Sequence, residues 1–214
     1  MIIVLIGPPG AGKGTQATYL AEILQGHIIS TGALLRDEVK KKSSLGLQVA
    51  DIINSGKLVS DDLLFKIIVE KMYGLNSKVV LFDGYPRTLG QVTQLQELAE
   101  EHSISALHFD VAPEVVKQRL LGRLTCSECG GTFHTIFAAP KAEGKCDFCG
   151  NDLIQRKDDS ALKVAKRLGV YEKETKPILD FYKGLGAYKR IDANSSRESV
   201  RCALEEWVTE ISKK

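Results

Sequence analysis

The sequence predicts an α/β fold in which helices cover both faces of a parallel β-sheet. Residues 2–6, 79–82 and 107–111 are continuous apolar runs bounded by turn residues, which is typical of strands buried on both faces. Segments with the apolar spacing of helices lie between these runs. Because strands and helices alternate along the chain, we expect right-handed βαβ crossovers and a layered sandwich.

The helical segments carry their own signals. A glycine-rich turn after the first strand leads into a helical pattern over residues 16–24. A second helix is predicted to begin after Ser60, a good N-cap residue, with Asp61 and Asp62 facing the helix dipole in the first turn. Its apolar stripe recurs at four-residue steps, at Leu64, Ile68 and Met72. A last striped helix is expected over residues 198–211.

The composition excludes several classes of protein. The 214 residues are 43% hydrophobic, which suffices for one substantial core with inserted lobes. The net charge is only +2, from 29 basic and 27 acidic residues, so we expect no nucleic-acid partner. No stretch approaches the ~20 apolar residues that span a bilayer, and the N-terminus lacks the signals of secretion. We therefore expect a cytoplasmic protein with no membrane partner, and a monomer.

The segment GPPGAGKGT, at residues 7–15, fits the GxxxxGK pattern of a phosphate-binding loop. It lies between a predicted strand and a predicted helix, so that backbone N–H groups and the helix N-terminus can face phosphate oxygens. Lys13 supplies an ammonium that can follow a transferring phosphoryl group. The hydroxyl usually found directly after the lysine comes one place later, at Thr15, so we do not expect it to ligate magnesium directly. An ordinary glycine-rich turn is the alternative interpretation.

Six arginines lie at segment borders around this loop. Phosphoryl transfer concentrates negative charge, and one well-placed arginine is worth about 10³–10⁵ in rate. An acceptor that is itself a phosphate needs more cations, because like charges ~4 Å apart repel by ~4 kcal/mol at an effective dielectric of about 20. Taken singly, each arginine could be a solvated surface group, but their joint placement predicts phosphate binding. The set consists of Arg36, Arg87, Arg119, Arg123, Arg156 and Arg167.

Two segments interrupt the alternation of strands and helices. Residues 30–59 contain helical pieces between glycines, at Gly32, Gly46 and Gly56. Residues from about 123 to 156 are rich in glycine, cysteine and proline and predict a small β-rich lobe. We expect both to be insertions into a nucleotide-binding core formed by residues 1–29, 60–121 and 159–214.

Four cysteines in the second insertion have the spacing of a structural metal site, CxxC–x16–CxxC. Four thiolates satisfy tetrahedral zinc and leave no open position. A zinc ribbon that binds nucleic acid is one alternative, which the acidic residues of the lobe disfavour; disulfides or free thiols are another. His134 is expected to be a surface or packing residue, and Cys202 to pack in the core. The ligand set is Cys126, Cys129, Cys146 and Cys149.

Together these motifs resemble those of adenylate kinases. GPPGAGKGTQ, STGxLLR, GKLVSDDL, FDGYPRT with Gln91, and QRKDD followed by KRL occur in the order and spacing of that family and cover essentially the whole chain. The cysteine lobe is similar to the zinc-bearing lid of the long bacterial type. The resemblance implies a P-loop NTPase three-layer sandwich with a five-stranded parallel sheet, a helical NMP-binding lobe at residues 30–59 and a lid at residues 122–158 that closes over ATP.

The resemblance also implies roles for single residues. Arg36 and Arg87 would hold the AMP phosphate, Gln91 would read the adenine edge, and Asp83 would hold a magnesium-bound water. The ATP set is Gly10, Ala11, Gly12, Lys13, Gly14, Thr15, Arg119 and Arg123. The AMP set is Thr31, Gly32, Arg36, Lys57, Val59, Gly84, Arg87, Gln91, Arg156 and Arg167. The catalytic set is Lys13, Arg87, Arg123, Arg156 and Arg167, with the lid-hinge carboxylates Asp158 and Asp159.

Three positions depart from the family pattern. Ala33 replaces an aspartate, Tyr85 replaces a phenylalanine, and Leu124 replaces a second arginine after Arg123. None of these changes removes a matched phosphate ligand.

The predicted function is the reversible reaction ATP + AMP = 2 ADP, by direct in-line transfer with magnesium. We expect ATP, AMP and ADP as partners, and magnesium and a structural zinc as cofactors. One alternative is a kinase for UMP, CMP or GMP; Gln91 and the segment around Thr31 favour adenine. The other is a nucleotide-gated adaptor that holds a partner with its zinc lobe. The arginine set argues against an adaptor, because mere binding does not require transition-state cations.

Overall fold

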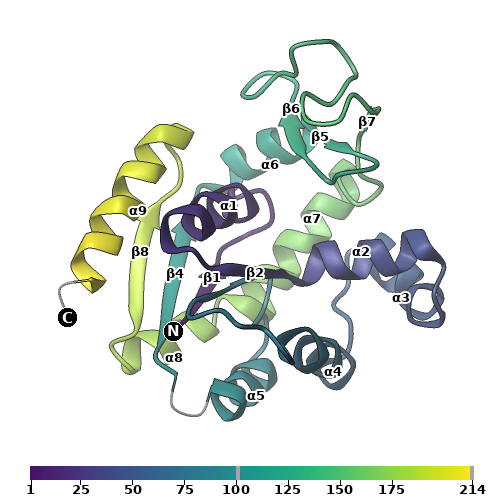
Figure 1. The fold of residues 1–214 in the computed structure, drawn as a ribbon. Coiled ribbons are helices and arrows are strands. Elements are labelled where there is room, and N and C mark those ends of the chain that lie inside the picture. The colour runs from purple at the N-terminus through teal and green to yellow at the C-terminus, as the bar shows by residue number, and fades with distance from the viewer. Residues whose placement is uncertain (100–101, 213–214) are drawn as a thin grey trace.

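The computed structural model describes residues 1–99 and 102–212 (Figure 1). Its core is a five-stranded parallel sheet in the order β2-β3-β1-β4-β8. The strands are β1 (Ile2–Ile6), β2 (His27–Ser30), β3 (Val80–Asp83), β4 (Ile104–Asp110) and β8 (Tyr188–Asp192). This confirms the predicted α/β class, the parallel sheet and its five strands.

Alternate residues of β1 face two separate hydrophobic cores. Ile2, Val4 and Ile6 join one core, which α4 (Asp61–Met72), α5 (Leu89–Ala99) and α8 (Ile178–Gly184) cover. Ile3 and Leu5 join the other, which α1 (Lys13–Leu24), α6 (Pro113–Leu121) and α9 (Arg197–Ile211) cover. Two further helical elements, α7 (Ala161–Val170) and the π-helix η1 (Tyr171–Thr175), lead from the lid into α8. The sheet is therefore the middle layer of a three-layer sandwich.

Several predicted boundaries move by a few residues. The first helix begins at Lys13 rather than residue 16, and β4 begins at Ile104 rather than residue 107. Ser60 is the N-cap of α4 as predicted, although its side chain makes no capping hydrogen bond among the described residues.

The first insertion is a pair of helices, α2 (Thr31–Lys41) and α3 (Ser44–Asn54). The prediction that Gly46 separates helical pieces was wrong, because it lies inside α3. A Cβ at this position would lie 2.0 Å from the carbonyl oxygen of Glu38, so the glycine allows α3 to pack directly against the backbone of α2.

The second insertion is the lid, with a three-stranded antiparallel sheet of β5 (Arg123–Cys126), β6 (Thr132–His134) and β7 (Leu153–Ile154). The predicted β-rich lobe is confirmed. In Figure 1 the lid projects at the top and the α2–α3 pair at the right, away from α9. His134, the last residue of β6, is buried where the lid meets α6, and its Nε2 lies 3.2 Å from the carbonyl oxygen of Gln118.

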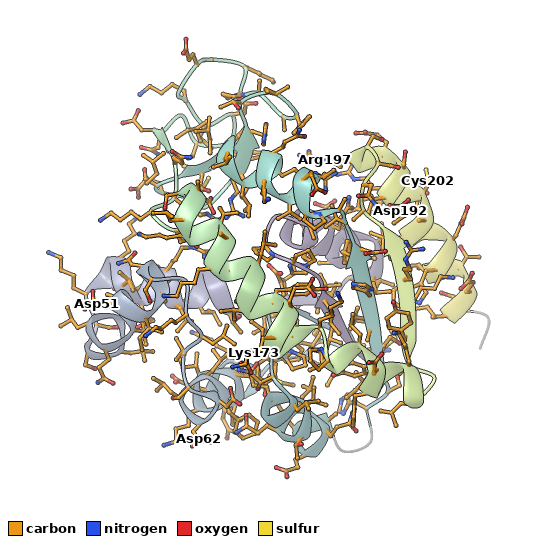
Figure 2. The ribbon with its side chains drawn as sticks, turned by 180° about the vertical axis from the view of Figure 1, so that it is seen from behind. Asp51, Asp62, Lys173, Asp192, Arg197 and Cys202 are labelled. Atoms are coloured by element: carbon orange, nitrogen blue, oxygen red, sulfur yellow. The ribbon has the colours of Figure 1, made fainter. Side chains whose placement is uncertain are left out.

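Cys202 corrects another expectation, since its side chain is exposed rather than in the core. The buried face of α9 consists of Val200, Leu204 and Trp207, and residue 202 falls outside that stripe. Figure 2 shows Cys202 on α9, far from the lid. In the part of the chain that the structure covers, no helix is long and apolar enough to cross a membrane.

Candidate active site

The glycine-rich loop joins the end of β1 to the start of α1. Gly10 and Gly12 have φ angles of +80° and +90°, a left-handed conformation that glycine adopts without strain. The Lys13 ammonium donates to the carbonyl oxygens of Gly7 at 2.7 Å and Pro8 at 2.8 Å. Burial lowers the Lys13 pKa to about 8, an effect that the Asp83 carboxylate opposes and nearby arginines reinforce. Lys13 is thus a desolvated cation held against its own loop.

The end of β3 lies beside this loop and gathers four of the expected residues. The Thr31 hydroxyl donates to the Gly84 carbonyl oxygen at 2.9 Å, and Arg87 Nε donates to the same oxygen at 2.7 Å. Asp83 accepts from the Ser30 hydroxyl at 3.1 Å, and its Oδ2 would lie 3.2 Å from a Cβ on Gly14. Burial lowers the Arg87 pKa, and Asp83 opposes this shift. The carboxyl edges of β1 and β3 therefore place Lys13, Asp83 and Arg87 together.

Arg36 extends from α2 toward the same region. Its Nη1 would lie 3.1 Å from a Cβ on Gly32, so the guanidinium folds over the start of its own helix. Burial lowers the Arg36 pKa; Asp158 opposes that effect, and the positive charges of Arg123 and Arg167 add to it.

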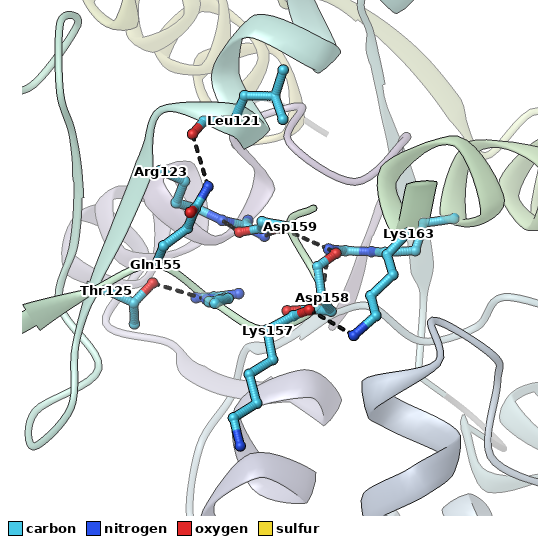
Figure 3. A network of polar contacts seen from close by, with 10 residues as sticks. Leu121, Arg123, Thr125, Gln155, Lys157, Asp158, Asp159 and Lys163 are labelled. Carbon is cyan, nitrogen blue, oxygen red and sulfur yellow. Dashed lines mark hydrogen bonds and ion pairs between the residues drawn. The ribbon is translucent and has the colours of Figure 1, made fainter. Parts of the chain in front are cut away.

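A fully buried carboxylate joins the two ends of the lid (Figure 3). Asp159 accepts from Arg123 Nε at 2.7 Å and Nη2 at 2.6 Å, and from Arg167 Nη1 at 2.8 Å. Arg167 Nη1 also lies 2.9 Å from Asp158 Oδ2. Bidentate pairing fixes the plane of the Arg123 guanidinium. Two arginines and two aspartates from β5, α7 and the segment before α7 thus form one ion-pair network.

Arg156 and Arg119 flank that network. Arg156 Nε donates to the Thr125 hydroxyl at 2.8 Å, and burial, with Arg123 and Arg36 nearby, lowers its pKa. Arg119, on α6, donates to the carbonyl oxygens of Ala193 at 2.8 Å and Ser195 at 3.2 Å. Arg119 therefore lies over the loop that follows β8.

The remaining expected residues lie in three places. Gln91 is buried in α5, where its side chain is 1% exposed and bonded at both ends. Lys57 and Val59 lie in the segment between α3 and α4, where the Lys57 N–H donates to the Ile52 carbonyl oxygen at 3.2 Å. The loop and the start of α1 hold Gly10, Ala11, Gly12, Lys13, Gly14 and Thr15.

The four lid cysteines form a cluster that fits structural zinc. All four sulfur atoms lie within 4.8 Å of one another, with Cys126–Cys149 at 3.4 Å and Cys129–Cys146 at 3.6 Å. Tetrahedral zinc with ~2.3 Å bonds places its sulfur ligands about 3.8 Å apart. The Glu128 N–H donates to the Cys126 sulfur at 3.4 Å, as expected for a thiolate ligand. The donor set and its spacing therefore agree with the predicted metal.

Sequence reasoning missed residues that support this site. The sequence pattern indicates for Asp61 only a place at the dipole of α4, yet its carboxylate accepts hydrogen bonds from Thr88 and Gln91. No sequence pattern marks Thr175, whose hydroxyl donates to the Arg87 carbonyl oxygen at 3.0 Å. The spacing Thr88-x-Gly90-Gln91 is the sequence signal that could have indicated the contacts of Asp61 with Thr88 and Gln91.

The phosphate loop, the opposing arginines and the two inserted lobes define a P-loop kinase that acts on nucleoside monophosphates. The family model described as Adenylate kinase matches residues 5–187. Adenylate kinase of Clostridium tetani is 39% identical over 204 residues, covering 94% of each chain. That of Caldanaerobacter subterraneus is 41% identical over 204 residues, covering 94% of this chain and 92% of the relative. This chain belongs to the adenylate kinase family.

Membership of this family decides between the functions that the sequence left open. Adenylate kinases are phosphotransferases that use magnesium-bound ATP and convert ATP and AMP into two ADP. The family favours AMP over UMP, CMP or GMP as the acceptor, and an enzyme over a nucleotide-gated adaptor.

Proposed function

We propose that the arginine set and Lys13 carry out adenylate kinase chemistry in this chain. The observation that carries the proposal is the convergence of buried cations on one region. Lys13, Arg87, Arg123 and Arg167 lie close enough that the charge of each arginine lowers the Lys13 pKa, while Asp83 raises it. Such a surplus of desolvated positive charge is costly unless an anion binds there.

ATP binds on the loop side of this region in the proposed arrangement. Backbone N–H groups of residues 10–15 and Lys13 hold its phosphates, Arg119 contacts it from α6, and Arg123 contacts it from the lid. When bound, magnesium neutralises part of the charge on the ATP phosphates. Asp83 faces the loop across Gly14, and an oxygen donor there suits a magnesium-bound water.

AMP binds on the other side, between α2 and the end of β3. Arg36 and Arg87 hold its phosphate, and the segment of Lys57 and Val59 lines the base pocket with Thr31, Gly32 and Gly84. Gln91 contacts the adenine edge. Arg156 and Arg167 reach the transferring group from the lid hinge, where Asp158 and Asp159 fix the direction of Arg167 and the Thr125 hydroxyl holds Arg156.

The transfer itself needs positioning rather than a side-chain base. An AMP phosphate oxygen, already ionised, bonds to the γ-phosphorus of ATP. The bond from that phosphorus to the β,γ-bridging oxygen breaks, and the bridging oxygen keeps the electron pair, which leaves two ADP molecules. Lys13 and the arginines stabilise charge on the equatorial oxygens. Closure of the lid excludes water and so suppresses hydrolysis of ATP.

We also propose the division into a core of residues 1–29, 60–121 and 159–214, an NMP lobe of residues 30–59 and a lid of residues 122–158. A monomer suffices in this proposal, because every residue of the cationic set comes from one chain. The proposed location is the cytoplasm, where reducing conditions keep the lid thiols available to metal.

Steady-state transfer from magnesium-bound ATP to AMP, UMP, CMP and GMP, with a chelator control, tests the proposal. We expect rapid ADP formation with AMP alone. Arg87→Ala should mainly raise KM for AMP, and Arg123→Ala or Arg156→Ala should mainly lower kcat. Unchanged AMP kinetics in Arg87→Ala would contradict the proposed acceptor site. If folded, zinc-loaded protein transferred phosphate to none of these acceptors, the proposed kinase activity would be overturned.

A further inference from the structure

The side-chain amide of Gln91 is held at both ends inside the protein. Its Oε1 accepts from the backbone N–H of Arg87 at 2.7 Å, and its Nε2 donates to Asp61 Oδ1 at 2.7 Å. The residue is 1% exposed, so water does not compete for these bonds. The amide therefore has one defined orientation.

The chemistry of the two partners fixes which end is which. A backbone N–H can only donate, and an ionised carboxylate can only accept. If the amide turned over, a donor would face the Arg87 N–H and an acceptor would face Asp61. Two buried bonds would be lost and like groups would oppose one another, so the reversed orientation is strongly disfavoured.

Asp61 is itself held in place by the start of α5. Its Oδ2 accepts from the Thr88 hydroxyl at 2.7 Å, and the Thr88 oxygen accepts from the Gln91 N–H at 3.1 Å. A Cβ on Gly90 would lie 2.8 Å from Asp61 Oδ2, so glycine makes room for the carboxylate. Asp61 thus bridges the first turns of α4 and α5 and touches none of the phosphate-binding arginines named above.

We propose that Asp61 is a specificity-determining residue, which orients the Gln91 amide so that it complements a 6-amino base and rejects a 6-oxo base. This inference rests on the proposed contact between Gln91 and the base of the acceptor. After its two internal bonds the amide keeps one lone pair on Oε1 and one N–H on Nε2. Adenine offers a donor at N6 and an acceptor at N1, which match them.

A 6-oxopurine presents the opposite pattern, with an acceptor at O6 and a donor at N1. In the same pose both of its groups would meet like groups of the amide. Sites built on hydrogen bonds discriminate strongly in this way, because a mismatched base leaves buried polar groups unpaired. Cytosine shares the donor–acceptor pattern of adenine, so its rejection does not depend on Asp61.

The test compares AMP with IMP, which differ at this edge alone. In Asp61→Asn the new amide can donate to a reversed Gln91, while the Arg87 N–H still favours the original orientation. We expect the ratio of kcat/KM for AMP to that for IMP to fall roughly tenfold, as for the loss of one hydrogen bond to a charged group. The KM for ATP should not change. Thr88→Val, which frees one oxygen of Asp61, should lower the ratio less and in the same direction.

Asp62→Asn is the matched control, since Asp62 lies one position further on α4 (Figure 2) and its carboxylate accepts one hydrogen bond from the described side chains, from Gln94 Nε2 at 3.4 Å. It should leave the ratio unchanged. Equal losses with AMP and IMP in both Asp61→Asn and Thr88→Val would show mere structural support and overturn the inference. If Gln91→Ala leaves the wild-type ratio intact, the proposed contact of Gln91 with the base fails instead. If Gln91→Ala abolishes discrimination and Asp61→Asn does not change it, only the role of Asp61 fails.

Discussion

The ammonium of Lys40, near the end of α2, lies 2.9 Å from the carboxylate of Glu128 in the first zinc knuckle of the lid. It also donates to the carbonyl oxygen of Ser127 at 3.2 Å. These residues belong to the two different insertions and are 88 positions apart in the chain. The two lobes therefore touch outside the proposed nucleotide site, at a loop in which the Glu128 N–H also faces the Cys126 sulfur.

The contact between Lys40 and Glu128 should contribute a small coupling between the lobes. Both side chains are about half exposed, at 52% and 53%, so a double-mutant cycle with Lys40→Met and Glu128→Gln should give about 0.2–1 kcal/mol. Energy transfer between fluorophores on the two lobes gives the fraction of molecules in which the lobes touch, and this fraction in each variant yields the coupling free energy. High salt should abolish the coupling energy that this cycle measures. A coupling that salt does not affect would exclude an ion pair as its cause.

Removal of the Asp159 carboxylate should be far more damaging. Asp159→Asn leaves Arg123 and Arg167 without their shared buried partner, and breaking a buried pair in this way costs about 3–5 kcal/mol. Chemical denaturation measures this loss. Asp152→Asn is the control, because its pair with Lys145 is exposed and should be worth less than about 1 kcal/mol. Similar losses in the two variants would contradict the importance of burial.

Removal of zinc should unfold the lid selectively. The buried cluster of the lid consists only of Cys126, Phe133 and Cys146, with Leu124 and Leu153 packed against it, so the metal must supply much of its stability. We expect one zinc per chain by elemental analysis, and loss of amide protection in the lid after chelation. Cys129→Ser should lower the zinc content, whereas Cys202→Ser should not, since Cys202 is exposed on α9. Equal zinc content in all three proteins would refute the site.

The activity should fall as pH rises through the pKa of Lys13. This pKa is about 8 in the free protein, so kcat/KM for ATP should decline above that pH as the ammonium loses its proton. Bound phosphate favours the charged form, so kcat should persist to higher pH. Lys13→Arg keeps its charge throughout, and its profile, at lower activity, should lose this decline. A decline shared by both proteins would assign the titration to another group.

The stability should show the opposite trend in the same range. A lysine in the unfolded chain has a pKa near 10.5, so between about pH 8 and 10.5 the unfolded state binds more protons than the folded one. Lys13 therefore contributes a rise in the free energy of unfolding across this window. Urea unfolding of wild type and Lys13→Met at several pH values isolates it, since the variant lacks the group.

The sequence predicts some parts of this fold better than others. β1 and the first three residues of β3 are recognisable because they are wholly apolar and buried on both faces, whereas Asp83 at the end of β3 is polar and partly exposed. The edge strands β2 and β8 have the sequences HIIS and YKRID, in which one side is partly open and polar residues break the run. Their presence was expected only from the resemblance. Apolar patterning reports burial, so it is weakest where a strand has one neighbour.

The candidate site follows the same division. The glycine loop and the CxxC pairs are local in sequence, and their chemistry could be inferred from spacing. The hydrogen bond between Asp61 and Gln91 joins two residues that are 30 positions apart in the chain and lie on different helices. The complete burial of Asp159 likewise depends on how the lid packs against α7. No local pattern encodes such distances.

The pairing of Arg123 with Asp159 has a consequence for the lid as a replaceable unit. Arg123 begins the first strand of the lid sheet, Asp159 lies two residues before α7, and their side chains touch. We expect that a segment with adjoining ends tolerates shortening to a tight turn, or exchange for another small fold, without a shift in the register of the five-stranded sheet. The five-stranded core should therefore keep its fold when another small domain takes the place of the zinc lobe.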